Sequence, residues 1–216
     1  MPLLFKHTHP VRGVWKLEET VEELAGMLSN KEWYTPFLES KAAEKRKKEW
    51  LACRVLLREL AGEELKVDYQ ANGAPYVPGS TLQISFSHTK DYVAVILSDV
   101  PVAIDIEYTG DRIRKIRSKF MNPEEEAALD PLHETTHLLL HWCAKETLFK
   151  LIRQEEVDFR KHLHIQPFPY HTSGSFIAEE TRTPEQINYS LMFIVTPAFV
   201  LTYCEDSDLN DHPSFK

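Results

Sequence analysis

Three short runs rich in β-branched and aromatic residues lie close together in the middle of the chain, at residues 83–87, 92–97 and 102–106. Runs of this length and composition are typical of β-strands. Links of only four residues join them, at 88–91 and 98–101, whereas a parallel connection needs about a dozen residues or more for its crossover. The spacing therefore predicts a sheet of neighbouring antiparallel strands.

Helical periodicity flanks these strands on both sides. Apolar residues recur at intervals of three and four between Thr20 and Leu60, which predicts two helices. A second helical region begins near Ile113 and includes Asn122-Pro123, a favoured N-cap residue followed by a favoured first residue of a helix. A further helix is predicted from Thr135 to Ile152, and residues 187–204 return to strand-like composition.

This order of elements predicts an α+β protein with mostly antiparallel sheets and two comparable halves. We expect an N-terminal half at residues 1–98 and a C-terminal half at residues 99–216. The most apolar stretch, residues 191–204, is interrupted at Thr196-Pro197. It is shorter than the ~20 apolar residues that a membrane helix needs, so we expect two strands around a turn.

Charge and cysteine content exclude several classes of protein. The 216 residues include 33 acidic and 25 basic side chains, a formal net charge of −8, which disfavours attraction to nucleic acid or to an anionic membrane. The three cysteines form no close pair, so neither a disulfide framework nor a thiolate zinc site is indicated. Residues 1–15 lack the apolar core of a signal peptide, and we expect a cytoplasmic protein.

Two carboxylates, Asp105 and Glu107, interrupt the third apolar run. Residues two apart on a strand face the same side, where neighbouring carboxylates repel each other and lose hydration. A cation between them would relieve both penalties, and Mg²⁺ prefers such oxygen ligands together with water and phosphate. An edge strand with a solvated acidic face would explain the same pattern.

Trp142, Glu146 and Lys150 recur at intervals of four and therefore share one stripe of a predicted helix. An ordinary Glu–Lys helix pair is the simpler interpretation. In a functional interpretation, Glu146 supplies a third oxygen ligand or a base, and the ammonium group of Lys150 holds a phosphoryl group.

Two basic segments could contact an anion. Ser85–Lys90, at a strand end, carries two serine hydroxyls, an imidazole and an ammonium group, and it could equally form a simple turn. The charge run at residues 44–49, followed by Arg54 and Arg58 one turn apart, is typical of a solvated helix face and could also reach an anionic ligand.

His133 and His137 match the His-Glu-x-x-His pattern of zinc proteases, which makes a zinc hydrolase an alternative. Against it, Leu140 and Cys143 stand where the extended form of that motif needs glycine and histidine.

Five short motifs follow one another in order: Gly73-Ala-Pro75, Ser85-Phe-Ser-His88-Thr, Ala103-Ile-Asp105-Ile-Glu107, Phe120 to Glu124, and Trp142-Cys-Ala-Lys145-Glu146-Thr-Leu-Phe-Lys150. Together they resemble the 4'-phosphopantetheinyl transferases, and more specifically the surfactin-synthetase-activating (Sfp-like) type, a single chain of about this length. The resemblance implies two similar halves related by a pseudo-two-fold axis, with coenzyme A and Mg²⁺ bound between them.

The resemblance also implies the reaction. A serine hydroxyl of an apo acyl or peptidyl carrier protein attacks the phosphorus of coenzyme A that bears the pantetheine arm, and adenosine 3',5'-bisphosphate is released. By resemblance, the Mg²⁺ ligands are Asp105, Glu107 and Glu146. Glu146 is also the expected proton acceptor, and Lys150 lies beside the pyrophosphate.

Coenzyme A contacts are implied for Arg54, Ser87 and His88, with His88 toward the 3'-phosphate. Glu124 falls where the family often carries another acid near the metal, although an acid in the first turn of a helix is explained by the helix dipole alone. The expected protein is a monomeric holo-carrier-protein synthase of fatty acid or polyketide biosynthesis.

Departures from the family pattern leave a second alternative. Ala74 stands where the family has a phosphate-pairing lysine, and Ala103 stands where it usually has glycine. We expect weaker coenzyme A binding, for which Lys90 or the basic run Lys41 to Lys48 could compensate. The second alternative is therefore a relative of the family that binds coenzyme A or a carrier protein without catalysing transfer. Docking of an acidic carrier would need a local basic surface, for which the candidates are Arg112, Arg114, Lys115 and Arg117.

Overall fold

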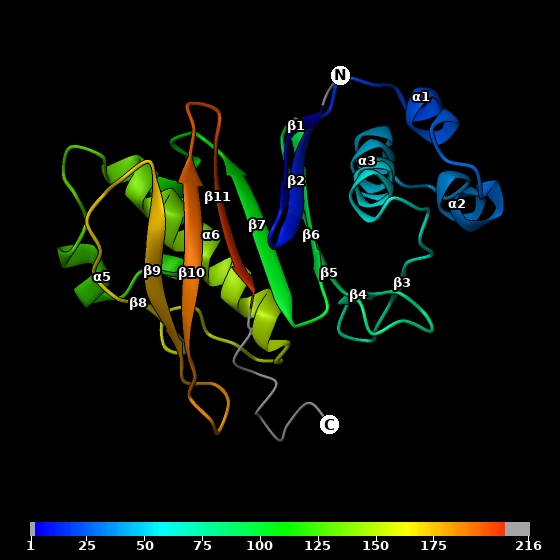
Figure 1. Cartoon of the computed structure of the whole chain (residues 1–216). Helices are drawn as coiled ribbons and strands as arrows, with labels where there is room; N and C mark the ends of the chain where they lie inside the picture. Colours follow the sequence, from blue (N-terminus) through cyan, green and yellow to red (C-terminus); the bar gives the residue numbers. More distant parts are fainter. Residues whose placement is uncertain (1–2, 206–216) are drawn as a thin grey trace. The chain divides into compact units, whose positions relative to one another are not determined.

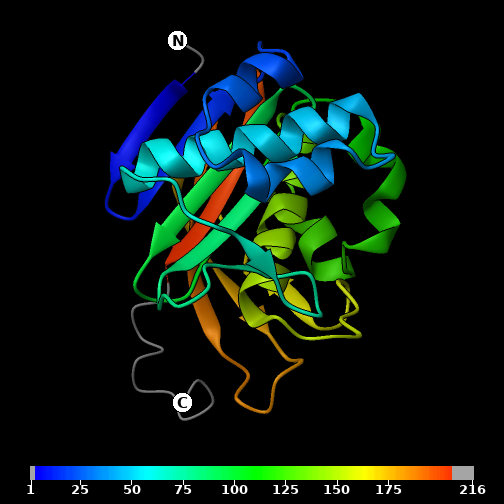
Figure 2. The ribbon, with the colours of Figure 1, turned by 90° about the vertical axis from the view of Figure 1, so that its right-hand side faces the viewer.

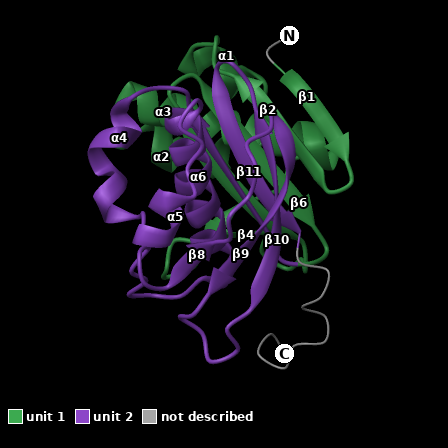
Figure 3. Cartoon of the chain, turned by 90° about the vertical axis from the view of Figure 1, so that its left-hand side faces the viewer, with its two compact units in different colours: residues 1–100 green, residues 101–216 purple. Residues whose placement is uncertain are grey.

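A computed structural model describes residues 3–205 and divides the chain into two compact units, residues 1–100 and 101–216 (Figure 3). Each unit combines helices with a sheet, and every strand pairing among the described residues is antiparallel. The predicted α+β class with mostly antiparallel sheets is therefore confirmed. The units join in sequence between β6 (Tyr92–Ser98) and β7 (Val102–Tyr108) (Figure 1).

The first unit contains a four-stranded sheet in the order β1-β2-β6-β5. β5 (Gln83–Thr89) and β6 are the two strands predicted from the apolar runs, and they pair with Ser87 opposite Ala94. β1 (Leu3–Thr8) and β2 (Val11–Lys16) were not predicted, because Arg12 and Gly13 break the apolar pattern of β2. A small hairpin of β3 (Asp68–Tyr69) and β4 (Pro75–Tyr76) completes this unit.

Helix α3 (Glu44–Ala61) lies across the first sheet, with α1 (Val21–Gly26) and α2 (Lys31–Leu38) beside it (Figure 2). The region therefore holds three helices where periodicity predicts two, because Pro36 inside α2 interrupts the helical pattern. The approach of α3 to β2 is close: a Cβ at Gly13 would lie 3.3 Å from Leu56 Cδ1 and 3.0 Å from the Phe5 carbonyl oxygen. A side chain at this position would push the helix from the sheet.

The second unit contains a five-stranded sheet in the order β7-β11-β10-β9-β8. Its strands are β7, β8 (Leu163–Ile165), β9 (Ser173–Glu180), β10 (Asn188–Val195) and β11 (Phe199–Glu205). β10 and β11 flank the turn at Thr196-Pro197, so the predicted pair of strands around a turn is confirmed. β7 pairs with β11 along its whole length.

Helix α6 (Glu134–Ile152) packs on this second sheet and contacts β7 and β11. It matches the predicted helix and is preceded by α4 (Arg112–Ile116), the short turn Arg117–Lys119 and α5 (Pro123–Ala127). The predicted helix start at Asn122 is confirmed, since its side chain accepts the Glu125 backbone N–H with proline at the first helical position. Among residues 3–205, no helix combines the length and apolar character needed to cross a bilayer.

Candidate active site

Asp105 and Glu107 lie two residues apart on β7, opposite Thr202 and Val200 of β11. Only 4% of Asp105 is exposed, and Glu107 is half-buried. β7 ends the sheet order of its unit, but a carboxylate as buried as Asp105 is not a solvated surface group. The interpretation of this pair as the acidic face of an edge strand is therefore disfavoured.

Lys150, near the end of α6, holds Asp105. Its Nζ donates to Asp105 Oδ1 at 2.6 Å and to the Ile104 carbonyl oxygen at 3.0 Å. Burial is the largest single influence and would lower the pKa of Lys150, but the charge and hydrogen bond of Asp105 together with the charge of Glu146 outweigh it and raise that pKa. The lysine therefore stays cationic and offsets the charge of the buried aspartate.

Glu146 lies one turn before Lys150, and its surroundings raise the pKa of its carboxyl group to about 7. Burial is the largest cause, the negative charges of Asp105 and Glu107 add to it, and the positive charge of Lys150 opposes it. A carboxyl group tuned to this range can accept or release a proton near neutral pH, as general acid–base catalysis requires.

Trp142 completes the stripe on α6. Its indole Nε1 donates to Glu107 Oε1 at 2.9 Å. The three residues predicted to share one helix face thus all interact with the acids of β7, through an indole contact, a charge interaction and an ion pair. The structure therefore brings together the carboxylate pair of β7 and the stripe on α6, which the sequence pattern indicated as two separate features.

The chemistry of these donors fits a hard divalent cation. Three carboxylates within mutual electrostatic range supply the oxygen ligands that Mg²⁺ prefers, and a cation would relieve the repulsion that raises the pKa of Glu146. In the part of the chain described, no three His, Cys, Asp or Glu side chains are already arranged as a ligand shell. Asp105 instead contacts Lys150, and Glu107 contacts Trp142.

Arg54, predicted to contact coenzyme A, lies inside the first unit and is 4% exposed. Its guanidinium group stacks on Trp50 at 3.8 Å from the ring centroid, donates to the Trp50 carbonyl oxygen at 3.1 Å and donates to the Tyr69 hydroxyl at 2.6 Å. These contacts are those of a packing residue that fixes α3 against the β3–β4 hairpin.

Ser87 and His88 are neighbours on β5 but face different surroundings: Ser87 is 7% exposed, whereas His88 is exposed. The imidazole of His88 contacts the guanidinium of Arg46, and its Nδ1 lies 3.5 Å from Glu49 Oε2. Both partners belong to the charge run at residues 44–49, so that run meets the end of β5. The sequence pattern named Arg46 only as part of the basic run Lys41 to Lys48, which was expected to compensate for Ala74, and did not single it out as the partner of His88.

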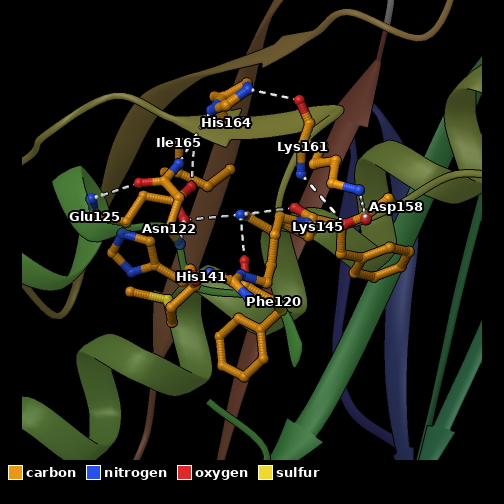
Figure 4. A network of polar contacts seen from close by, with 12 residues as sticks. Phe120, Asn122, Glu125, His141, Lys145, Asp158, Lys161, His164 and Ile165 are labelled. Atoms are coloured by element: carbon orange, nitrogen blue, oxygen red, sulfur yellow. Dashed lines mark hydrogen bonds and ion pairs between the residues drawn. The ribbon is translucent and has the colours of Figure 1, made fainter. Parts of the chain in front are cut away.

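Lys145 is fully buried in a polar network beside the stripe (Figure 4). Its Nζ donates to Glu125 Oε2 at 2.8 Å, to the Phe120 carbonyl oxygen at 2.6 Å and to the Phe159 carbonyl oxygen at 2.9 Å. Burial lowers the pKa of Lys145, and the nearby charge of Glu125 opposes that effect. The network joins α6 to α5 and to the segment after α6.

Glu125, and not Glu124, is the acid of α5 that enters the interior. Its carboxylate also accepts the backbone N–H groups of Asn122 at 3.0 Å and Ile165 at 2.9 Å, which ties α5 to β8. Glu124 is exposed in the first turn of α5. Its position fits the helix-dipole explanation, and a role for Glu124 near a metal stays a prediction.

The two histidines of the zinc-protease pattern have different environments. His133 is exposed and stacks on Tyr170 with a centroid distance of 4.0 Å, while His137 is buried and its Nδ1 accepts the Asp130 backbone N–H at 3.0 Å. Glu134, which would be the base, is bound by Arg114 and Arg117. These contacts leave no catalytic geometry for a zinc hydrolase at this motif.

His137 and His141 form a buried pair on successive turns of α6, each 1% exposed. His141 Nδ1 contacts the His137 carbonyl oxygen at 2.8 Å, and the Nε2 atoms of both rings lack a hydrogen-bond partner among the residues described. Burial lowers the pKa of His137, and it lowers the pKa of His141 to about 3. Both rings are therefore neutral in the folded protein at neutral pH.

This pair predicts a loss of stability in acid. The unfolded chain binds protons at these histidines near pH 6.5 and the folded chain does not, so stability is full above that pH and falls below it. Between pH 7.5 and pH 5, His141 alone should lower the free energy of unfolding by about 2 kcal/mol, measured by urea unfolding. His141→Phe should flatten this slope and the exposed control His171→Gln should keep it; an unchanged slope in His141→Phe would contradict the assignment.

Residues 101–204 match the family model of the 4'-phosphopantetheinyl transferase superfamily. The match runs from β7 to β11 and so includes the two acids of β7 and the stripe on α6. It supports phosphopantetheinyl transfer as the general class of activity. A search of curated proteins found no match.

Proposed function

We propose that this protein transfers the 4'-phosphopantetheine group from coenzyme A to a serine of an apo carrier protein in an Mg²⁺-dependent reaction that releases adenosine 3',5'-bisphosphate. One observation carries the proposal: Asp105 and Glu107 on β7 lie against Glu146 and Lys150 on α6, within the residues that match the superfamily. We propose the surfactin-synthetase-activating type, because the first unit repeats the plan of an antiparallel sheet covered by one long helix.

Asp105, Glu107 and Glu146 would hold the Mg²⁺. When bound, Mg²⁺ stabilises negative charge that develops on the phosphate oxygens during attack and departure. The buried position of Asp105 and its ion pair with Lys150 keep this carboxylate fixed in place.

Glu146 is the proposed proton acceptor for the attacking serine hydroxyl. Burial raises the pKa of its carboxyl group to about 7 in the absence of a cation, and a bound cation would favour the carboxylate form, which is the form that accepts the serine proton. Lys150 has three N–H donors, two of which bind Asp105 and the Ile104 carbonyl oxygen; the third would bind a phosphate oxygen of coenzyme A as charge develops there.

Coenzyme A binding in the first unit is proposed for His88 and Ser87. The contact between His88 and Arg46 supports an anion site at the end of β5, because it places the positively charged guanidinium group of Arg46 beside the His88 ring. Arg46 would then compensate for the lysine that Ala74 replaces. Arg54 would act indirectly, by fixing the hairpin through Tyr69.

The carrier protein would dock on the exposed basic side chains of α4. Arg114 on α4 and Arg117 just after it form ion pairs with Glu134. Arg112 and Lys115 are exposed on α4 and are the two residues that we propose to meet the carrier. Electrostatic attraction of an acidic carrier to these two residues would speed association more than it would tighten binding.

The test is to incubate the protein with coenzyme A, Mg²⁺ and a panel of apo carrier proteins, and to follow the carriers by mass spectrometry. We expect one added phosphopantetheine arm per carrier, and no addition when the acceptor serine is replaced by alanine. Binding of coenzyme A or of a carrier without any addition would instead favour the non-catalytic relative.

A further inference from the structure

Trp142 makes a directed contact with an acid of the candidate site. Its Nε1–H donates to Glu107 Oε1 at 2.9 Å. The ring is held on its other sides by Phe120, in an edge contact at a centroid distance of 5.2 Å, and by Phe159 at 5.6 Å. An indole N–H group can only donate a hydrogen bond, so Glu107 Oε1 is the acceptor in this contact.

Each acid of β7 thus has its own partner on α6. Lys150 holds Asp105, and Trp142 holds Glu107 two turns earlier on the same helix face. Glu107 has the greater need of a partner, because it is only half-buried and its side chain has one more rotatable bond than aspartate. The Trp142 donor therefore restricts the rotamers of the Glu107 carboxylate.

We propose that Trp142 is a positioning residue that fixes the orientation of Glu107 as a ligand for the divalent cation, an inference that rests on the proposed function. Groups that hydrogen-bond to metal ligands orient them, and removing such a group typically weakens metal affinity or activity by 10–100-fold. The indole acts through Glu107 and does not itself touch the cation.

Trp142→Phe separates this role from simple packing, since phenylalanine keeps an aromatic ring between Phe120 and Phe159 but has no N–H to donate. We expect the Mg²⁺ concentration for half-maximal transfer to rise about 10-fold. The kcat at saturating Mg²⁺ should recover to within about threefold of wild type, because excess cation compensates for a poorly oriented ligand.

A second readout does not depend on turnover. Binding of Mg²⁺ to the folded chain raises its Tm, so the Tm should rise with Mg²⁺ in the absence of coenzyme A and carrier. At a subsaturating Mg²⁺ concentration this rise should be smaller for Trp142→Phe than for wild type. Trp33→Phe on α2, also a half-buried tryptophan, is the matched control and should keep both the wild-type Tm rise and the wild-type Mg²⁺ dependence of transfer.

Either of two results overturns the inference while the proposed function stands: a wild-type Mg²⁺ dependence of Trp142→Phe in both assays, or a loss of kcat that no Mg²⁺ concentration restores. If wild type neither transfers the arm nor responds to Mg²⁺, both the inference and the proposed function fail.

Should Trp142→Phe not fold, the wild-type chain labelled with ¹⁵N at its indoles answers the same question. The Trp142 Nε1–H resonance, assigned by removing the other tryptophans one at a time, must shift on addition of Mg²⁺, and an unmoved resonance overturns the proposal.

Discussion

Replacing Glu146 with glutamine is expected to lower the rate of phosphopantetheine transfer by about 10³-fold, the range that a positioned general base contributes. Glutamine has nearly the same shape but cannot take up the serine proton or give a charged oxygen to a cation. The rate is measured by mass spectrometry of the carrier at saturating coenzyme A and Mg²⁺. Glu146→Asp retains a carboxylate on a shorter arm and should lie between the glutamine variant and wild type.

The same substitution should not destabilise the protein. Because burial raises the pKa of Glu146 from 4.5 to about 7, this group lowers stability as pH rises above about 4.5, and the full penalty is present above about pH 7; the neutral amide avoids it. At pH 8 without divalent cation, Glu146→Gln should therefore unfold at a urea concentration equal to or above that of wild type. The exposed control Glu185→Gln should leave both rate and stability unchanged. Transfer by Glu146→Gln at a near-normal rate would remove Glu146 from the mechanism.

The fold was predictable where one periodicity dominates a segment. β5, β6 and β7 read as apolar runs with short links, and α6 keeps its apolar positions over five turns, from Glu134 to Ile152. β8 and β9 escape prediction for physical reasons: β8 has only three residues, and β9 alternates small and polar residues with Phe176 and Ala178. β9 pairs with β10 and β8 pairs with β9, and no local pattern encodes these contacts.

The three acids of the candidate site, Asp105, Glu107 and Glu146, were likewise visible in the sequence as two local patterns: a pair on one face of a strand and a stripe on a helix. What local patterns could not supply is which side chain on one element meets which on the other. The sequence pattern suggests a phosphate ligand for Lys150, and the structure pairs it with Asp105. It suggests a coenzyme A contact for Arg54, which stays a prediction, and the structure stacks the Arg54 guanidinium on Trp50 in the interior of the first unit. Both contacts depend on how a helix, α6 for Lys150 and α3 for Arg54, packs against segments that are distant in the sequence.

Lys145 shows the same limit most clearly, since the sequence gives an unremarkable lysine next to Glu146 and the structure buries it completely. Lys145→Met is expected to lower the free energy of unfolding by about 3–5 kcal/mol. Methionine fills a similar volume but leaves Glu125 as a buried carboxylate without its cation, and it leaves the carbonyl oxygens of Phe120 and Phe159 without this donor.

Urea unfolding of the full chain measures this loss of stability, and two further variants serve as controls for its interpretation. Lys161→Met removes an exposed lysine whose Nζ lies 3.1 Å from Asp158, and a surface pair of this kind should cost less than about 1 kcal/mol. The double variant Lys145→Met with Glu125→Leu removes both buried charges together and should recover part of the loss, because the main cost of the single change is the unpaired carboxylate. A single-variant loss as small as that of Lys161→Met would mean that the network in Figure 4 contributes little to stability, and that packing of α6 alone sets the position of Glu146.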